Sequence, residues 1–564
     1  MLTNQKAARP WLSAYPPGVP AEIEADRLGT LVDLFETSVS QFADKPAVQC
    51  FGATLTYSSV AASARDMAAW LASQGLGKGD RVALMMPNVP AYPIAIMGVL
   101  LAGCTVVNIN PLYTPRELTA QLNDSGSRII VVLENFARTV AESLPDVRLD
   151  RVVVSGPGDA LGLRGRVIGL ASRYIKKAVP AYTLPAGLKI GFEAMLKDGR
   201  SRKRAAAAIS PDDIAFLQYT GGTTGVAKAA MLTHRNIMAN VTQSDAWFGL
   251  SRAGTNGSGK VMVTALPLYH IFALTCCFFF FFKVGGCCLL IPNPRDAAGF
   301  IKTLKSNRFT HLSGVNTLFN LLLNQPGFDT VDFSKVEFTI AGGMAVQSAV
   351  ATRWQALTGH AIIEGYGLSE TSPVVCVNPP GLKQWSGTIG FPLPSTDVAV
   401  RGLDGYEVAP GEAGELCVRG PQVMAGYWNR PDETARATTP DGYFRTGDVA
   451  VLLPDGQLRI VDRMKDMILV SGFNVYPNEI EDVIAGHPGV LECAVVGAAF
   501  EETGEMVVAH VVRRDEALTT EILRSYARSQ LTGYKVPRRI VFHDSLPKTN
   551  VGKVLRRALR DDAA

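Results

Sequence analysis

Apolar runs that predict strands alternate with helical periodicity through the first two thirds of the chain. Val82–Met86 and Cys104–Asn108 predict buried strands, and Tyr92–Ala102 between them predicts a helix. This alternation extends from about Leu31 to Gly390. It favours layers of helices on mainly parallel sheets, which is α/β architecture.

The pattern changes from about Gly387, where short strands follow one another closely. The turn Pro454-Asp455-Gly456 joins the last two strands as a hairpin. After the charged break Asp462–Asp466, helices and strands alternate again over about 100 residues. We therefore predict an α/β fold with a large N-terminal domain (1–461) of layered α/β subdomains plus a β-rich subdomain (about 387–461), a hinge (462–466), and a small mobile C-terminal α+β domain (467–564).

Two stretches lack formal charge over a length that could cross a membrane, namely Val82–Pro115 and Val261–Phe282. The first is the strand–helix–strand unit described above. Pro267, Tyr269 and His270 interrupt the second, so it predicts a buried strand ending near Leu266, a loop, and an apolar helix that holds Phe278–Phe282. A transmembrane span is the minor alternative. Residues 1–20 lack the apolar segment of a signal peptide.

Composition narrows the class of protein. The chain is 47% hydrophobic and 19% charged, and its net charge of +4 is small for 564 residues, which argues against nucleic acid as the main partner. The nine cysteines show no C-x-x-C pair and no zinc spacing. A reduced, cytoplasmic compartment fits this usage.

The segment Tyr219–Ala230 is the most informative in the chain. Glycine backbone N–H groups can close on an anion, threonine hydroxyls donate further hydrogen bonds, and a lysine adds positive charge. The segment therefore predicts a phosphate-binding loop, although a plain Gly/Thr turn after a strand is the alternative. The candidate residues are Thr220, Gly221, Gly222, Thr223, Thr224, Gly225 and Lys228.

Three further motifs follow predicted strands. His270 follows a buried strand, where parallel-sheet proteins place active sites, but a satisfied core histidine is equally compatible. Gly342 and Gly343 let a flat ligand approach the backbone. In the segment Gly365–Thr371 an aromatic ring could stack on a base, a hydroxyl could bind phosphate and a carboxylate could hold Mg²⁺. A simple strand-end turn is the alternative for both glycine motifs; the second offers Gly365, Tyr366, Gly367, Ser369 and Glu370.

Two charged candidates lie nearer the C-terminus. Asp448, after Thr446-Gly447, could accept both hydroxyls of a ribose; a solvated turn aspartate is the alternative. Lys553 follows Gly552 and is predicted to open a helix with Arg556, Arg557 and Arg560 on one face, and such a charge run is usually a solvated face. The chain has no G-x-S-x-G, no H-E-x-x-H, and no G-x-G-x-x-G between a strand and a helix.

In this order and spacing the motifs resemble the adenylate-forming enzymes, which comprise acyl-CoA synthetases, adenylation domains and firefly luciferase. Within them, the chain most resembles the bacterial long-chain-fatty-acid–CoA ligases. Small departures from the family pattern are Ala229, Ser369 and Met464, and Ala229 leaves open whether the phosphate loop is stiffened. The resemblance covers essentially the whole chain and rests on Tyr219–Ala230, Leu266–Ala273, Asn293–Asp296, Glu364–Glu370, Gly420–Met424, Thr446–Asp448, Ile460–Glu481, Leu531–Pro537 and Asn550–Arg557.

The resemblance implies a two-step ligation. A fatty-acid carboxylate attacks the α-phosphate of ATP, giving acyl-AMP and pyrophosphate, and the thiol of coenzyme A then displaces AMP. Thr220–Thr224 and Lys228 would hold the β- and γ-phosphates, and Glu370 would hold Mg²⁺. Tyr366 would stack on adenine against the backbone of the glycine motifs.

The resemblance also implies roles for residues of the second half. Asp448 and Arg463 would bind the ribose, and Lys553 would bridge the carboxylate and the α-phosphate. Rotation about Lys465 would then exchange Lys553 for the loop of Ser471, Gly472 and Phe473 beside a pantetheine tunnel lined by His270. Phe278–Phe282 would wall an acyl channel, although core packing explains these side chains nearly as well.

Other functions stay open at the sequence level. They are a ligase for aryl or medium-chain acids, a luciferase-like oxygenase, and a non-catalytic fatty-acid carrier or uptake protein. The complete set Lys228, Glu370, Asp448 and Lys553 argues against the carrier. The expected partners are the small-molecule substrates, with no nucleic acid, and the expected location is the cytoplasm with peripheral contact to the inner membrane. The oligomeric state is not predicted.

Overall fold

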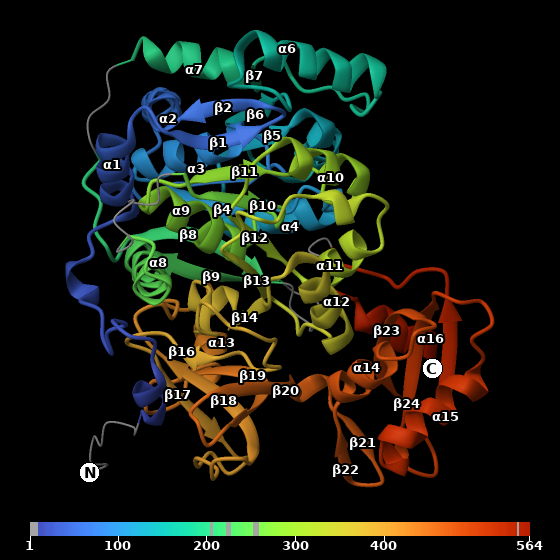
Figure 1. Ribbon diagram of the computed structural model, residues 1–564. Coiled ribbons are helices and arrows are strands. Elements are labelled where there is room, and N and C mark those ends of the chain that lie inside the picture. The colour runs from blue at the N-terminus through green and yellow to red at the C-terminus, as the bar shows by residue number, and fades with distance from the viewer. Residues whose placement is uncertain (1–8, 203–206, 221–226, 252–258, 550–551, 564) are drawn as a thin grey trace.

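The computed structural model describes residues 9–202, 207–220, 227–251, 259–549 and 552–563, and their strands form four sheets of nine, seven, four and five strands. Figure 1 shows the two larger sheets with their helices in the upper part of the molecule, the four-stranded sheet below them, and the five-stranded sheet at the lower right. The chain is thus a layered α/β body with a β-rich part and a smaller C-terminal α+β domain, as the sequence predicts.

The seven-stranded sheet has the order β7-β6-β5-β3-β4-β8-β9 and is parallel except for the β8–β9 hairpin. The predicted strand–helix–strand unit is β3, α3 and β4. Its strands are β3 (Arg81–Met85), β4 (Thr105–Asn108), β5 (Ile129–Leu133), β6 (Arg151–Ser155), β7 (Lys189–Gly191), β8 (Ile214–Thr220) and β9 (Lys228–Thr233), and its helices are α3 (Ala91–Leu101), α4 (Pro115–Ser125), α5 (Ala137–Ser143), α6 (Gly162–Leu170) and α7 (Phe192–Arg200).

Helix ends in this body follow the local sequence. The Thr114 hydroxyl accepts a hydrogen bond from the Glu117 N–H while the Glu117 carboxylate accepts one from the Thr114 N–H, so two N–H groups that lack partners at the start of α4 are satisfied. Gly126, with a φ of 62°, ends the same helix in the left-handed conformation that glycine adopts without strain.

The nine-stranded sheet has the order β16-β15-β14-β13-β12-β10-β11-β1-β2, and its central strands are parallel. Antiparallel pairs lie only at its two ends among the described residues. The strands are β1 (Pro46–Cys50), β2 (Ala53–Thr56), β10 (Val261–Thr264), β11 (Cys287–Leu290), β12 (His311–Gly314), β13 (Phe338–Gly342), β14 (Ile362–Gly367), β15 (Val374–Val377) and β16 (Phe391–Pro392).

A buried helical segment follows β10. It comprises the π-helical turn η6 (Ala273–Phe279) and α9 (Phe280–Lys283), and all of its side chains except Lys283 are buried. The predicted strand, loop and apolar helix of Val261–Phe282 are therefore confirmed, with the strand ending at Thr264. The other helices beside this sheet are α1 (Leu31–Phe42), α2 (Tyr57–Ser73), α8 (His234–Phe248), α10 (Ala297–Ser306), α11 (Asn316–Leu323) and α12 (Ser348–Thr358).

Within the described part of the chain, no helix has both the length and the apolar character needed to cross a membrane.

The β-rich part is an antiparallel sheet of β17 (Asp397–Arg401), β18 (Ala413–Arg419), β19 (Phe444–Leu452) and β20 (Leu458–Arg463), and the predicted hairpin joins β19 to β20. The helix α13 (Pro431–Arg436) lies between β18 and β19. Consecutive side chains are buried in the middle of β17 and β18, so both faces of the sheet are covered there.

The small domain follows η9 (Met464–Asp466). Its five strands are β21 (Ile468–Val470), β22 (Phe473–Val475), β23 (Val490–Phe500), β24 (Gly504–Arg513) and β25 (Arg539–His543), with the helices α14 (Pro477–Ala485), α15 (Thr520–Gln530) and α16 (Arg556–Ala563). Figure 1 places this domain beside the lower end of the large body, next to α11 and α12.

One predicted boundary is wrong. Lys553 does not open the C-terminal helix, because α16 begins at Arg556. The backbone before the helix turns back on itself instead: the Thr549 N–H donates to the Lys553 carbonyl at 2.6 Å, and the Leu555 N–H donates to the Pro547 carbonyl at 2.8 Å. Lys553 therefore lies in a short loop rather than on a helix.

Candidate active site

Two strands of the nine-stranded sheet end in glycines that form a flat backbone surface. Gly342 of β13 pairs with Gly365 of β14. A Cβ atom at Gly342 would lie 3.0 Å from Phe272 and 3.2 Å from the Gly365 carbonyl, and one at Gly367 would lie 2.0 Å from the Pro373 carbonyl. Gly367 leaves no room for a side chain and Gly342 leaves very little, and the carboxyl ends of parallel strands are where such sheets bind ligands.

Tyr366 and Asp448 meet above this surface from two different sheets. The Tyr366 hydroxyl donates to Asp448 Oδ2 at 2.5 Å, and Arg463 Nε lies 3.2 Å from Asp448 Oδ1. Arg463 is the cross-strand partner of Asp448 in the β19–β20 hairpin. Burial raises the pKa of the Asp448 carboxyl, while Arg463 and the Tyr366 hydrogen bond oppose that shift.

Glu370 is a buried carboxylate beside the same strand end. It lies in the short turn η8 (Ser369–Thr371), where Ser369 precedes it, and it accepts a hydrogen bond from the Tyr427 hydroxyl at 2.8 Å. Burial raises the pKa of Glu370 above its usual value. A carboxylate held this way gains from a cation placed against it.

Lys228 begins β9, directly opposite Thr220 at the end of β8. Its ammonium group lies over the Tyr427 ring, 5.5 Å from the centroid, and pairs with the carboxylate of Glu433 on α13. Tyr427 thus contacts both Lys228 and Glu370. The predicted loop residues Gly221, Gly222, Thr223, Thr224 and Gly225 lie outside the described residues.

Lys553 reaches this site from the small domain. A Cβ atom at Gly343 would lie 3.4 Å from Lys553 Cε and 3.6 Å from Nζ, so the lysine side chain crosses the glycine surface. Burial lowers the pKa of Lys553 to about 8, the positive charges of Arg463 and Lys465 act in the same direction, and Asp448 opposes them.

His270 lies at the end of the loop after β10, where its carbonyl accepts the Leu274 N–H of η6 at 3.1 Å. Burial lowers its pKa to about 3, and the charge of Lys553 adds to that shift. The imidazole is therefore neutral at pH 7 and lies near Lys553. Lys553 is thus close enough to affect the pKa of His270, and Arg463, Asp448 and Lys465 are close enough to affect the pKa of Lys553. The structure therefore brings these five predicted residues together.

Three predicted residues lie elsewhere. Ser471, Gly472 and Phe473 form the exposed tip of the β21–β22 hairpin, which projects from the lower edge of the small domain in Figure 1. The Ser471 N–H donates to the Thr503 carbonyl at 2.8 Å, and the Phe473 ring stacks on Tyr534 at 4.8 Å. Both contacts hold the tip against other residues of the small domain.

Polar contacts between the two domains keep Lys553 in place. The Thr317 hydroxyl of α11 donates to the Gly552 carbonyl at 2.8 Å, next to Lys553. At the start of α12, the N–H and hydroxyl of Ser348 both donate to Asp482 Oδ1 of the small domain at 2.9 Å. A small-domain carboxylate thus caps a large-domain helix.

The predicted basic face of the C-terminal helix is not solvated throughout. Arg556 lies 2.8 Å from Glu481, 3.7 Å from Asp462 and 3.6 Å from Asp466, and Arg560 lies 2.8 Å from Asp466. Only Arg557 is exposed. The charged break predicted as a hinge is therefore tied by ion pairs to the terminal helix.

Tyr427, Glu433, Ser348 and Asp482 complete the site and were not predicted from the sequence. They carry no local signal, because each acts on a partner more than fifty residues away. The Gly420–Met424 motif does precede Tyr427 closely, and the Met424 N–H donates to the Glu370 carbonyl at 2.8 Å. That motif was the one available indication that this segment borders the site.

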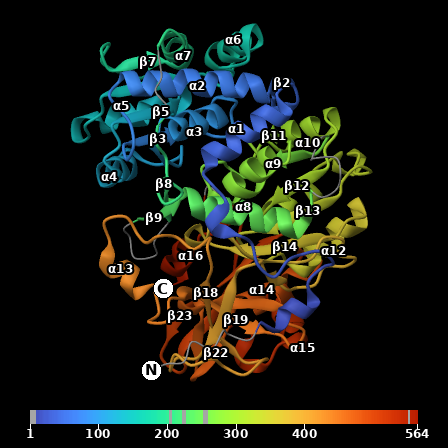
Figure 2. The ribbon, with the colours of Figure 1, turned by 90° about the vertical axis from the view of Figure 1, so that its left-hand side faces the viewer.

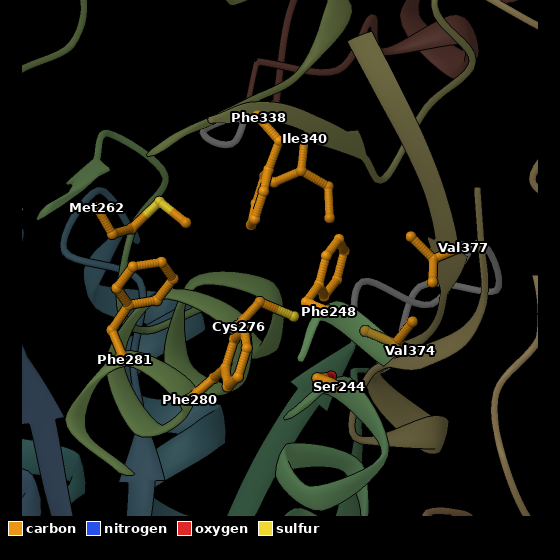
Figure 3. A pocket seen from close by; sticks show the side chains of 10 residues that line it. All are labelled: Ser244, Phe248, Met262, Cys276, Phe280, Phe281, Phe338, Ile340, Val374 and Val377. Atoms are coloured by element: carbon orange, nitrogen blue, oxygen red, sulfur yellow. The ribbon is translucent and has the colours of Figure 1, made fainter. Parts of the chain in front are cut away.

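An apolar cavity lies behind the glycine surface, between α8, η6 and the sheet (Figure 3). Its wall at β15 adjoins the site directly, since a Cβ atom at Gly365 would lie 3.5 Å from Val377 Cγ2. Every lining side chain except Ser244 is apolar or a thiol. The lining residues are Ser244, Phe248, Met262, Cys276, Phe280, Phe281, Phe338, Ile340, Val374 and Val377.

The side chains that could act as metal ligands indicate what kind of metal ion the site can bind. Among the described residues no three His, Cys, Asp or Glu side chains gather as a cation site. Glu370 can supply one buried carboxylate, so a hard divalent cation there would take its remaining oxygen ligands from phosphates or water. The residues present fit Mg²⁺ carried by a polyphosphate better than a protein-caged metal.

Comparison with known proteins agrees with this geometry. The AMP-binding enzyme family matches residues 35–428, and the AMP-binding enzyme C-terminal domain matches residues 479–553. A long-chain-fatty-acid–CoA ligase of Escherichia coli O157:H7 is 52% identical over 98% of both chains, and one of Bacillus subtilis is 36% identical over 99% of this chain and 98% of its own. The ATP-bound crystal structure of MatB from Rhodopseudomonas palustris has a TM-score of 0.77 at 28% identity and covers 94% of this chain and 98% of its own.

The lowered pKa of Lys553 predicts that its charged form reduces the free energy of unfolding. Because the unfolded chain binds the lysine proton more tightly, the charged side chain destabilises the fold below pH 8, and the penalty disappears as the pH rises towards 10.5. We expect Lys553→Met to increase the free energy of unfolding by roughly 1–3 kcal/mol at pH 7 and by less at pH 10. Thermal unfolding midpoints at the two pH values measure this, with the exposed Lys302→Met as the control. A gain that is absent, or equal at both pH values, would contradict the burial of the ammonium group.

Proposed function

The chain belongs to the AMP-binding enzyme family, and from that premise we propose that it joins long-chain fatty acids to coenzyme A through an acyl-adenylate, releasing AMP and pyrophosphate. The observation that carries the proposal is Lys553, which the small domain places over Gly343 beside Asp448, Arg463 and His270. A desolvated cation at the end of parallel strands suits a reaction in which two anions must meet.

The first step brings the fatty-acid carboxylate against the α-phosphate of ATP. A carboxylate oxygen forms a bond to phosphorus and the bond to pyrophosphate breaks. Lys553 bridges the two anions, while Asp448, oriented by Tyr366 and Arg463, accepts the ribose hydroxyls. Tyr366 and the backbone at Gly342 and Gly365 form the adenine surface.

Phosphate binding involves β8, β9 and η8. Thr220 and Lys228 flank the loop proposed to hold the β- and γ-phosphates, and Lys228 must leave Glu433 to reach them. Glu370 holds the Mg²⁺ that accompanies ATP. When bound, that ion neutralises charge on the phosphates as pyrophosphate departs.

In the second step the thiol of coenzyme A must reach the acyl-adenylate, so Lys553 must leave it. We propose residues 1–461 and 467–564 as the two moving parts and 462–466 as the hinge, with Lys465 as its pivot. Rotation withdraws Lys553 and brings the tip Ser471–Phe473 towards the thiol of coenzyme A beside His270. The exposed position of this tip on the small domain is compatible with such an exchange.

The apolar lining of the cavity behind Gly365 supports a long apolar substrate, but the cavity has a volume of only about 20 Å³, so an alkyl chain must displace lining side chains to enter it. Its lining offers no charged group, and one of its walls, at Val377, lies 3.5 Å from the position of a Cβ atom at Gly365. An alkyl chain that enters it would move its methylene groups from water into contact with phenylalanine and valine side chains. Burial of each methylene would contribute roughly 0.8 kcal/mol to binding. Aryl acids and medium-chain acids are the alternative substrates, and activity measured across a series of acids distinguishes them from long-chain acids.

We expect kcat/KM to rise from acids of about eight carbons to those of roughly fourteen to eighteen, because each added methylene is buried. Cys276→Phe, which fills the cavity, shifts the optimum to shorter acids, whereas Cys276→Ser keeps the volume and the profile. Thioester formation measured across chain lengths tests this. A higher kcat/KM for acetate or a cinnamate-type acid than for palmitate would make the long-chain assignment wrong.

Glu370→Ala should reduce pyrophosphate release at low Mg²⁺ on the order of 10²–10³-fold, since a preorganised charge contact is lost. Glu370→Gln, which keeps the Tyr427 hydrogen bond, isolates the charge and should lose nearly as much. Tyr427→Phe keeps the charge and is the control, with a loss of less than about tenfold for one hydrogen bond. Normal release by Glu370→Ala at low Mg²⁺ would count decisively against the metal role.

The two half-reactions should depend on different residues. Lys553→Ala should slow acyl-AMP formation by about 10²–10⁴-fold yet convert supplied acyl-AMP and coenzyme A to thioester. Lys465→Pro should do the reverse, because proline fixes φ and prevents the backbone change that a hinge requires. Single-turnover pyrophosphate release and thioester formation from supplied acyl-AMP measure the two steps, and Lys465→Ala controls for the lost charge. Equal loss of both steps in both variants favours one fixed active site.

A further inference from the structure

An unusual surface lies at the end of the molecule opposite the small domain. It is formed by α6 and the π-helical turn η5 (Ala171–Ile175), and both views show α6 at the upper edge (Figures 1 and 2). We call it the α6 surface, defined by residues 162–178. Large apolar side chains are exposed along it to an extent seldom tolerated in water: Leu163 78%, Val167 66%, Leu170 58%, Tyr174 67% and Ile175 80%.

These apolar side chains form one stripe. Leu163, Val167, Leu170 and Tyr174 recur at intervals of four, three and four residues, which places them on one face of a helix. The opposite face packs on the protein through Gly165, where an added Cβ atom would lie only 1.9 Å from the Gly158 carbonyl. The helix is therefore seated on glycine and turns its apolar stripe outward.

The stripe is bordered by positive charge. Residues 162–178 contain Arg164, Arg166, Arg173, Lys176 and Lys177 and no acidic residue. Since the whole chain carries only +4, the remainder is close to neutral and this surface holds the excess. Arg166, Lys176 and Lys177 are exposed, and their side chains make no ion pair with the described residues.

Contacts at both ends hold the α6 surface in a defined position. The Arg164 guanidinium lies against Gly52 in the β1–β2 turn, and Arg173 pairs with Glu134 at the end of β5. The Asn135 side-chain amide donates to the Ala178 carbonyl at 2.8 Å. The exposed stripe is thus part of the folded body rather than a loose segment.

We propose that the α6 surface binds the face of an anionic lipid bilayer, with its apolar side chains in the headgroup boundary and its cations against lipid phosphates. Exposed apolar side chains mixed with lysines and arginines, and no acidic residue, have the composition of a segment that binds a membrane interface, although the arginines of α6 lie among its apolar side chains rather than on a separate face. A second copy of the chain is a poorer occupant, because a symmetric contact would bring the exposed cations Arg166, Lys176 and Lys177 against the same cations of the other copy. Nucleic acid would leave the apolar stripe without a partner.

The position of the surface suits the proposed function but does not depend on it. Figures 1 and 2 place α6 at the far end from α14 and β23, so a bilayer bound there leaves the small domain free to rotate. Long-chain fatty acids partition into bilayers, so an enzyme held at the surface meets its substrate there. Lipid binding is measured without turnover, and its failure is therefore distinguishable from failure of the ligase assignment.

Vesicle sedimentation tests the proposal with the full chain. We expect binding to vesicles of 30% phosphatidylglycerol in phosphatidylcholine, weak binding to phosphatidylcholine alone, and release by high salt. The triple variant R166Q/K176Q/K177Q should lose roughly 10²-fold in partitioning, since each cation near an anionic surface contributes a factor of about five. A matched control removes three exposed cations elsewhere, namely K302Q/K335Q/R459Q, and should bind as the native chain does.

The apolar stripe is tested separately. All nine cysteines are buried, so a cysteine introduced by Leu170→Cys is the exposed thiol available to a polarity-sensitive fluorophore. We expect a blue shift of that label on adding phosphatidylglycerol vesicles and none from the same label at Leu403→Cys, a residue 98% exposed in the β-rich part. Thermal unfolding and thioester formation in detergent solution should match the native chain for every variant named here.

Three results would overturn the proposal. One is vesicle binding by R166Q/K176Q/K177Q equal to that of the native chain. Another is a blue shift at Leu170→Cys without vesicles that grows with protein concentration, together with a dimer in sedimentation velocity, which would assign the surface to self-association. The third is equal binding to neutral and anionic vesicles, which would remove the electrostatic half of the argument.

Discussion

The arrangement of the active site depends on one costly placement, the burial of the Lys553 ammonium group over Gly343. Burial lowers the pKa of this lysine to about 8, so the folded chain holds a cation that would be more stable in water. Such a group persists only if other contacts outweigh the penalty. The hydrogen bonds that flank it, from Thr317 to Gly552 and from Ser348 to Asp482, come from the large domain and supply that compensation. The penalty is also what makes the site useful, because a poorly solvated cation attracts two anions more strongly than a hydrated one does.

The described contacts between the domains include the hydrogen bonds Thr317–Gly552, Ser348–Asp482 and Asn320–Leu491, and polar contacts of this kind suit an interface that must open. Contacts of this kind resemble transient protein–protein interfaces, where relative motion is the default expectation. The ion pairs of Arg556 with Asp462, Asp466 and Glu481 are different, because they tie the terminal helix to the proposed hinge itself. Asp466 and Glu481 lie on the same side of Lys465 as Arg556, whereas Asp462 lies on the other side. We infer that rotation about Lys465 must stretch or break the Arg556–Asp462 pair and leaves the other two pairs intact.

Sequence patterns predicted the local elements well and the long-range partners poorly. The β3–α3–β4 unit and the β19–β20 hairpin follow from apolar periodicity and turn residues, which are short-range properties. Residues of one motif or of paired strands, such as Gly365 with Tyr366 or Asp448 with Arg463, were also expected together. The partners Glu433 for Lys228 and Asp482 for Ser348 are set by how sheets and domains pack, and no spacing along the chain encodes them. The start of α16 was misplaced for a related reason: backbone pairing with Pro547 and Thr549 competes with the helical pattern at Lys553 and prevails.

The Lys228–Glu433 pair has a consequence for how a polyphosphate would bind. Lys228 is already neutralised by a carboxylate and lies over the Tyr427 ring, so a phosphate must displace Glu433 rather than meet a free cation. Both side chains keep substantial exposure, at 26% and 30%, and an ion pair in such surroundings contributes only about 0–1 kcal/mol. The exchange of Glu433 for a phosphate, as proposed, would therefore cost little. The Tyr427 ring lies beneath Lys228, and the Tyr427 hydroxyl donates to Glu370. Release of Glu433 from Lys228 would therefore act on the ring of this tyrosine, and a cation that binds Glu370 would act on its hydroxyl. If Lys228 binds phosphate and Glu370 binds a metal ion, as proposed, the two events would be coupled through that tyrosine, and a polyphosphate that brings its own cation would satisfy both ends at once.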